Sequence, residues 1–179
     1  GKWVHYSIDP VGAERAVDTR KNVTLSLADV ALGTTSTTGN PQPLTIGGSE
    51  DGTVVTLSNV NINAGTSGYG IITFVKTNLT AENSTISGFS ALYVKPGSEE
   101  SSFSFVNSTL SGSTAGNDTE ANSFSVIALR ANDVTVTVDK NSTVTSTGDY
   151  SHAISLGGIF ENEETTSGNN VTIAGTIEG

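Results

Sequence analysis

The sequence predicts an all-β protein, a parallel β-helix of about six coils with three faces. Three observations predict it: a recurring corner motif, two alternating types of short strand, and an apolar position after each corner. The motif Asn-Ser-Thr-apolar recurs at residues 83–86, 107–110 and 141–144, and a looser copy stands at 59–62. A repeat of two short strands with a polar corner between them is typical of a parallel β-solenoid.

Two types of strand alternate along the repeat. The first type ends in an apolar-x-apolar pattern at residues 44–46, 73–75, 92–94, 127–129 and 154–156. The second type reads apolar-Ser/Thr-apolar at residues 23–25, 55–57, 79–81, 103–105, 134–136 and 171–173. Alternation of period two puts one set of side chains in the core and the hydroxyl set outside. The expected outward row is Thr24, Thr56, Thr80, Ser104, Thr135 and Thr172.

A third apolar position follows each corner and completes a triangular coil. It is occupied by Val30, Ile62, Ile86, Leu110, Val144 and Ile177. The repeat has the same length from Thr56 to Thr80 as from Thr80 to Ser104, and it lengthens afterwards. The extra residues fall in 113–122 and 159–169, which we expect to be loops inserted at corners.

The repeat also divides the chain. Residues 1–16 do not follow it, and we expect them to form an N-terminal cap or the link to one, because a solenoid end must cover its open core and its unpaired strand edge. Residues 17–179 are expected to be the coils of the parallel β-helix, part of a longer solenoid. The pattern indicates no helix and no second domain.

Composition and charge narrow the range of functions. Among the 179 residues, 8 are Lys or Arg and 18 are Asp or Glu, which gives a net charge of −10. Binding to phosphates needs Lys and Arg, so nucleic acid is not an expected partner. The chain has no Cys, which a solenoid tolerates because its stacked coils bury a continuous core. No apolar run is long enough to span a bilayer, so we do not expect the chain to be inserted in a membrane.

Aromatic residues recur at the start of the first strand, at one position of the repeat. They are Tyr69, Phe89, Phe124 and Tyr150. Stacked in successive coils, they would form a column that stabilises the solenoid through offset stacking, or a platform for the apolar face of a sugar. These four residues are therefore candidate ligand-binding residues.

Basic residues recur at the end of strands of the first type, at Arg20, Lys76, Lys95 and Arg130. They are either edge charges that keep a strand soluble or a polar strip that binds a carboxylated glycan. On the second interpretation Lys76, Lys95 and Arg130 are candidate ligand-binding residues. Acidic pairs in the loops lack the fixed spacing of a Ca²⁺ site. The sequence therefore indicates no metal site and no cofactor.

Polysaccharide-degrading enzymes also use this architecture, and they need acidic residues that converge on an exposed face. The expected outward row consists of Ser and Thr instead, and Asp139 with Lys140 is an isolated pair. His152 has Asp149 and Ser151 close in sequence, but neighbours along a strand point to opposite faces. The sequence therefore indicates no catalytic residue and no enzyme.

Asn-x-Ser/Thr triplets begin at Asn22, Asn78, Asn83, Asn107, Asn117, Asn141 and Asn170. In a secreted eukaryotic protein they would accept glycans. The alternative is structural, since Asn side chains at corners bond to turn backbones or stack as amide ladders. Asn83, Asn107 and Asn141 share one position of the repeat, which favours the structural role.

The repeat x-Val-Thr-Leu-x-Asn-x-x-Ile at residues 54–62, the corner motif at 83–86, the absence of Cys and the acidic, Thr/Asn/Gly-rich composition resemble the passenger domains of bacterial autotransporters. Pertactin-like and self-associating adhesins are the most similar in style. The resemblance covers nearly the whole chain from Val17 onward. It implies a right-handed β-helix that is exported across the outer membrane to the bacterial cell surface or secreted, where such domains serve virulence.

The function that this resemblance implies is a non-catalytic adhesin that mediates adhesion, self-association or biofilm formation. Its partners would be glycans or proteins on host or bacterial surfaces, or a second copy of the chain on another cell. An exposed solenoid face and the inserted loops would make the contacts. The alternatives are a pectate-lyase-like, polysaccharide-active enzyme and a structural stalk.

Overall fold

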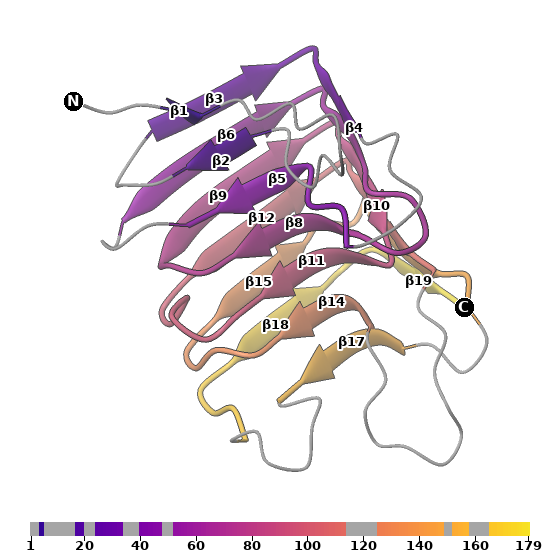
Figure 1. The fold of residues 1–179 in the computed structure, drawn as a ribbon. Helices are drawn as coiled ribbons and strands as arrows, with labels where there is room; N and C mark the ends of the chain where they lie inside the picture. The colour runs from indigo at the N-terminus through magenta and orange to yellow at the C-terminus, as the bar shows by residue number, and fades with distance from the viewer. Residues whose placement is uncertain are drawn as a thin grey trace.

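The protein is a parallel β-helix with three sheets, as the sequence predicts (Figure 1). The computed structural model describes residues 4–5, 17–19, 24–33, 40–47, 52–113, 125–148, 152–157 and 165–179. Within these ranges every regular element is a strand. Each coil passes through one strand of each sheet. Five complete coils run from β3 to β17, and β18 and β19 begin a sixth.

We call the three sheets A, B and C. Sheet A contains β1 (Val4–His5), β2 (Val17–Thr19), β5 (Leu44–Ile46), β8 (Tyr69–Thr73), β11 (Ser90–Val94), β14 (Ser125–Leu129) and β17 (His152–Leu156). Sheet B contains β3 (Thr24–Ala28), β6 (Thr53–Ser58), β9 (Thr77–Glu82), β12 (Ser102–Val106), β15 (Thr135–Val138) and β18 (Asn170–Ile173). Sheet C contains β4 (Ala31–Gly33), β7 (Asn61–Asn63), β10 (Thr85–Gly88), β13 (Thr109–Gly112), β16 (Thr143–Ser146) and β19 (Thr176–Glu178).

The first strands of sheet A mark the start of the coils. β2 pairs in parallel with β5, and it begins at Val17, where the sequence predicts the first coil. β1 pairs with β2 in the antiparallel direction. The strand pairs described for the rest of the chain are all parallel, so a strand that runs against the winding is confined to the N-terminal end.

The core is a set of columns, because each coil places an equivalent side chain over the one before it. One column in sheet B consists of Leu27, Leu57, Ala81, Phe105, Val138 and Ile173. In sheet C the column consists of Leu32, Ile62, Ile86, Leu110, Val144 and Ile177. Successive members lie about 4.8 Å apart along the axis of the helix. The alternating exposure of β3 and β6 in sheet B, and of β7 in sheet C, shows that these columns face inward and that the residues between them face solvent.

The register differs from the prediction by two residues at several positions. Thr24 pairs with Val54, so Ser26 rather than Thr24 stands in the outward row with Thr56. In the same way, Thr137 rather than Thr135 pairs with Ser104. A slip of two residues keeps every side chain on its own face, so the alternation of apolar and polar residues cannot detect it.

The same slip affects the third apolar position and sheet A. Leu32, not Val30, pairs with Ile62 in sheet C. In the second coil of sheet A the strand equivalent to residues 92–94 is 71–73, not the predicted 73–75. Phe74 therefore occupies the position of Lys95, and Lys76 lies two residues beyond it. The prediction that Lys76 shares the register of Lys95 is wrong for this reason.

Three described residues of the expected core are exposed, namely Val30, Leu156 and Ile177, and Leu156 allows a direct comparison with buried residues of the same register. Val94 and Leu129 are fully buried, and Leu156 pairs with Leu129 at the same position of the next coil. The relative exposure of Leu156 is nevertheless 56%. Among the described strands β17 stands at the end of sheet A, so Leu156 is paired there with a strand on one side.

The corner motif has a physical explanation in the turn between sheets B and C. Asn59, Asn83 and Asn107 have positive φ values of 53, 50 and 45°, a conformation that Asn tolerates better than most residues. The side-chain nitrogen of Asn107 donates to Oδ1 of Asn83 at 2.7 Å, which forms an amide ladder between coils. This geometry supports the structural role of Asn83 and Asn107.

The Ser of the motif points inward and forms a second ladder. Ser84, Ser108 and Ser142 are each at most 2% exposed. The backbone N–H of Ser84 donates to Oγ of Ser108 at 3.1 Å, and the N–H of Ser108 donates to Oγ of Ser142 at 2.9 Å. Oγ of Ser108 in turn donates to the carbonyl of Val106 at 2.9 Å. Each hydroxyl thus satisfies a buried N–H of the coil before it.

The third copy of the motif is modified by one extra residue. Val106 and Ser108 are separated by one residue, whereas Asp139 and Ser142 are separated by two. The carboxylate of Asp139 accepts hydrogen bonds from the N–H of Asn107 at 3.0 Å and from the hydroxyl of Ser142 at 2.6 Å. The bond from Ser142 is the main cause that holds the pKa of Asp139 below its usual value. Asn141 is therefore not a third member of the amide ladder.

Replacement of Ser108 by Ala should destabilise the protein by about 1–3 kcal/mol, because it leaves the buried N–H of Ser84 without its acceptor. Thr109→Ala is the matched control, since Thr109 is the next residue and its side chain is exposed. Its effect should stay within about 0.5 kcal/mol. Urea unfolding followed by circular dichroism measures both variants. Equal stabilities for the two would contradict the buried ladder.

Candidate binding surfaces

The outer face of sheet A carries a second apolar cluster, separate from the core. It is built on Ile72, Tyr93 and Ala128, which occupy the same position in three successive coils. Tyr69 and Phe74 pack against it. Because Tyr93 lies between the inward side chains of Leu92 and Val94, the alternation along β11 directs it outward. We call Tyr69, Phe74, Tyr93, Lys95 and Arg130 the aromatic–cation cluster.

Two of the four predicted aromatic residues meet in the structure. The ring of Tyr69 lies 6.4 Å from that of Phe89 between centroids, with an edge-to-face angle of 80°. Tyr69 pairs in register with Ser90, so the predicted alignment of Tyr69 with Phe89 is wrong by one residue. The shorter ring contact of Tyr69 is instead with Tyr93, whose ring centroid is 4.8 Å from that of Tyr69. Phe124 and Tyr150 lie outside the described residues.

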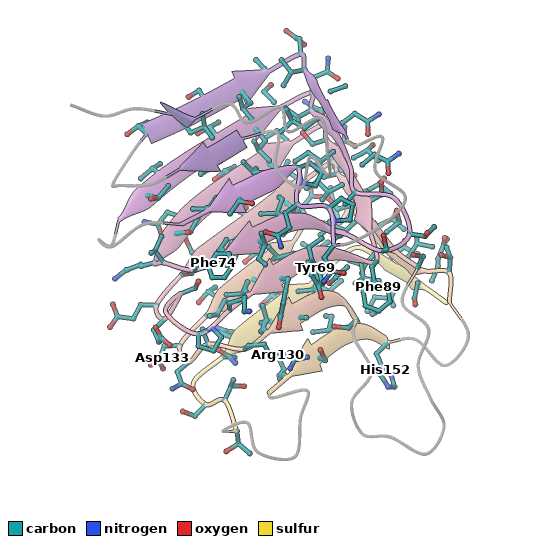
Figure 2. The ribbon with its side chains drawn as sticks, in the orientation of Figure 1. Tyr69, Phe74, Phe89, Arg130, Asp133 and His152 are labelled. Atoms are coloured by element: carbon teal, nitrogen blue, oxygen red, sulfur yellow. The ribbon has the colours of Figure 1, made fainter. Side chains whose placement is uncertain are left out.

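Two of the predicted cations gather at the same place. Nζ of Lys95 lies 5.4 Å from the ring centroid of Phe74 and 5.6 Å from that of Tyr93. The guanidinium carbon of Arg130 lies 5.8 Å from the centroid of Tyr93. Lys95 and Arg130 follow the paired residues Val94 and Leu129, so they occupy equivalent positions in adjacent coils, as the sequence predicts. In Figure 2 Phe74 lies toward the left of sheet A and Tyr69 to its right, and Arg130 lies below both of them, beside the strands of later coils.

Lys76 does not belong to this cluster. Its Nζ bonds to Oε2 of Glu100 at 2.5 Å. The hydrogen bond from Lys76 lowers the pKa of Glu100, which is exposed to solvent. Arg20 lies outside the described residues. The cluster therefore retains Lys95 and Arg130 from the predicted set of basic residues.

The sequence interpretation missed Tyr93 and Phe74, which connect the predicted residues. Tyr93 could have been found from its place between Leu92 and Val94, which marks it as the outward residue of an apolar strand. Phe74 could not, because its equivalence to Lys95 depends on the two-residue slip in the second coil. Tyr93 is 7% exposed and Arg130 is 6% exposed. They form the floor of the cluster, and the half-buried Tyr69, Phe74 and Lys95 form its accessible part.

Burial changes the chemistry of Tyr69. Its partly buried position raises the pKa of the phenol, and the positive charge of Arg130 offsets part of this rise. The hydroxyl of Tyr69 is therefore protonated across the physiological range of pH. The cluster combines neutral aromatic surface with two cations, which suits a ligand that has both an apolar face and a negative charge.

The outer face of sheet B is a second candidate surface, of a different character. Its two central columns consist of Thr24, Val54, Asn78, Ser102, Thr135 and Asn170, and of Ser26, Thr56, Thr80, Ser104, Thr137 and Thr172. None of these side chains is charged, and most are exposed. We call this surface the neutral face. The charged residues Glu82 and Asp139 stand at the edge of the sheet, next to the corner with sheet C.

Other kinds of site were sought in the described part of the chain. It contains no group of three or more His, Cys, Asp or Glu residues placed to hold a metal ion. It also contains no helix that could cross a lipid bilayer. No family model, curated protein or solved structure matches the chain.

Proposed function

We propose that this protein is a non-catalytic adhesin domain of the autotransporter-passenger type, which acts at the bacterial cell surface. The observation that supports this most is the neutral face. It extends over six strands of a rigid solenoid and presents hydroxyl and amide groups, which both donate and accept hydrogen bonds. The proposed function is therefore binding along this surface.

The charge of the protein supports the choice of this face. A chain with a net charge of −10 is repelled by other negatively charged surfaces, and those of bacterial and host cells are acidic. Contact through the neutral face avoids like-charge repulsion at the interface. Each hydrogen bond contributes only about 0.5–1.5 kcal/mol net, so the contact gains strength from its repetition along the coils.

Display of the chain on a non-adherent bacterium tests this proposal. We expect displaying cells to adhere to one another or to host cells, and Thr56→Glu with Thr137→Glu to reduce adhesion about tenfold, which corresponds to about 1.4 kcal/mol per contact. Both residues are exposed on the neutral face. Thr85→Glu with Thr109→Glu adds the same charges to exposed residues of sheet C and should leave adhesion unchanged.

Two outcomes would contradict the proposal. If displaying cells adhere no more than cells without the chain, the result would favour the alternative in which the protein is a structural stalk. Equal loss of adhesion in the two double variants would mean that total charge, rather than the neutral face, controls the contact.

A further inference from the structure

Lys95 is held in an unusual position for a cation of an acidic protein. Its ammonium group rests against the rings of Phe74 and Tyr93, and no described carboxylate forms an ion pair with it. Lys76, by contrast, bonds directly to Glu100. The three N–H donors of the half-buried Lys95 therefore remain available to a partner from outside.

A second positive charge lies next to Lys95. Arg130 occupies the equivalent position of the next coil, about 4.8 Å away along the sheet. Because Arg130 is buried against Tyr93, water and salt screen its charge less than they screen an exposed charge.

The surroundings of Lys95 are aromatic rather than polar. Phe74 lies beside the ammonium group, and Tyr69 extends the ring surface on the other side of Tyr93. Flat rings pack against the C–H face of a sugar, whereas a simple inorganic anion gains nothing from them. A ligand that uses both features has an apolar ring face and a negative charge in the same unit.

We propose that the aromatic–cation cluster binds a glycan that contains carboxylated sugars, such as uronic acids. Lys95 donates to the sugar carboxylate, and Phe74 and Tyr69 pack against the sugar rings. Tyr93 is a positioning residue, because the ammonium group of Lys95 rests against its ring, and Arg130 adds positive potential at the floor of the cluster. This site lies on sheet A and is separate from the neutral face of sheet B, so it goes beyond the adhesion proposed above.

Calorimetric titration of the whole chain with a hexamer of galacturonic acid tests the site, with the neutral hexamer of galactose as the matched ligand. We expect the acidic hexamer to bind at least about tenfold more tightly than the neutral one, and increasing salt to weaken it. Lys95→Gln should lower the affinity for the acidic hexamer about tenfold. Phe74→Leu should lower it as well, because a branched aliphatic side chain lacks the flat ring.

Lys76→Gln is the matched control, since it removes the same charge from an ion pair on another part of the surface. It should leave the affinity unchanged. Circular dichroism melts of all three variants should match that of the parent, because each changes a half-buried side chain outside the main core.

The proposal is overturned if the acidic hexamer does not bind, if Lys95→Gln binds it as well as the parent, or if Lys76→Gln weakens it equally. Equal binding of dextran sulfate, a glycan that carries sulfate groups but no carboxylate, and of the acidic hexamer would also overturn it, since that would show general attraction of anions. Cell adhesion that survives in Lys95→Gln leaves the proposed function standing even if the glycan does not bind. Glycan binding by a chain that does not make cells adhere would support the glycan site and contradict the proposed adhesin function.

Discussion

Replacement of Leu129 by Asp should unfold the coils on both sides of it. Leu129 is fully buried in the inward column of sheet A, between Val94 of the coil before and Leu156 of the coil after. A carboxylate there would be removed from water with no cation or hydrogen-bond donor provided for it. We expect a loss of more than about 4 kcal/mol, a large share of the stability of an ordinary domain.

Leu156→Asp is the matched control for this experiment. Leu156 has the same residue type and the same register as Leu129, but its relative exposure is 56%. The carboxylate stays hydrated, so the loss should be below about 1 kcal/mol. Urea unfolding monitored by the β-sheet circular dichroism signal compares the two variants. A cooperative transition of Leu129→Asp near that of the parent would show that Leu129 does not face the core.

The second large effect is expected for Phe105→Ala, with a loss of about 3–5 kcal/mol. Phe105 is fully buried in the central column of sheet B. Its neighbour in the preceding coil is Ala81 and its neighbour in the following coil is Val138. Neither side chain is large enough to fill the cavity that the ring leaves, so the structure can relax only partly around it.

Val106→Ala provides the comparison, because Val106 is the next residue and is only half-buried. It should cost less than about 1.5 kcal/mol. The double variant Phe105→Ala with Ala81→Phe moves the ring by one coil and conserves the total volume. It should be more stable than Phe105→Ala alone, since cores tolerate changes that keep their volume. If the double variant is the less stable of the two, the column does not pack as described.

The sequence predicted the coil and most of the core from its local patterns. Ile62, Ile86, Leu110 and Val144 stand in one buried column of sheet C, as expected from their places after the corner motif. The alternation along each strand was predicted correctly because it depends only on neighbouring residues. The predicted loops at 113–122 and 159–169 fall between β13 and β14 and between β17 and β18, and most of their residues lie outside the described part of the chain.

The register between coils could not be predicted with the same accuracy. Val30 and Leu32 are both apolar, and both could follow the corner, but only the pairing of β4 with β7 selects Leu32. The same ambiguity hid the equivalence of Phe74 and Lys95, and with it the place of Phe74 in the aromatic–cation cluster. A shift of two residues leaves the face of every side chain unchanged, so the apolar and polar pattern of a single strand cannot distinguish the two registers.

The amino-acid sequence by itself determined that this chain winds into stacked coils and which residues of each strand face the core. Those properties follow from alternation and from corner residues, which act over a few neighbouring positions. The tertiary structure alone decided which coil positions meet and which apolar residues remain in water. Leu129 and Leu156 carry the same side chain in the same place of the repeat, but among the described strands Leu129 has a paired neighbour on both sides and Leu156 on one, and only Leu129 is buried.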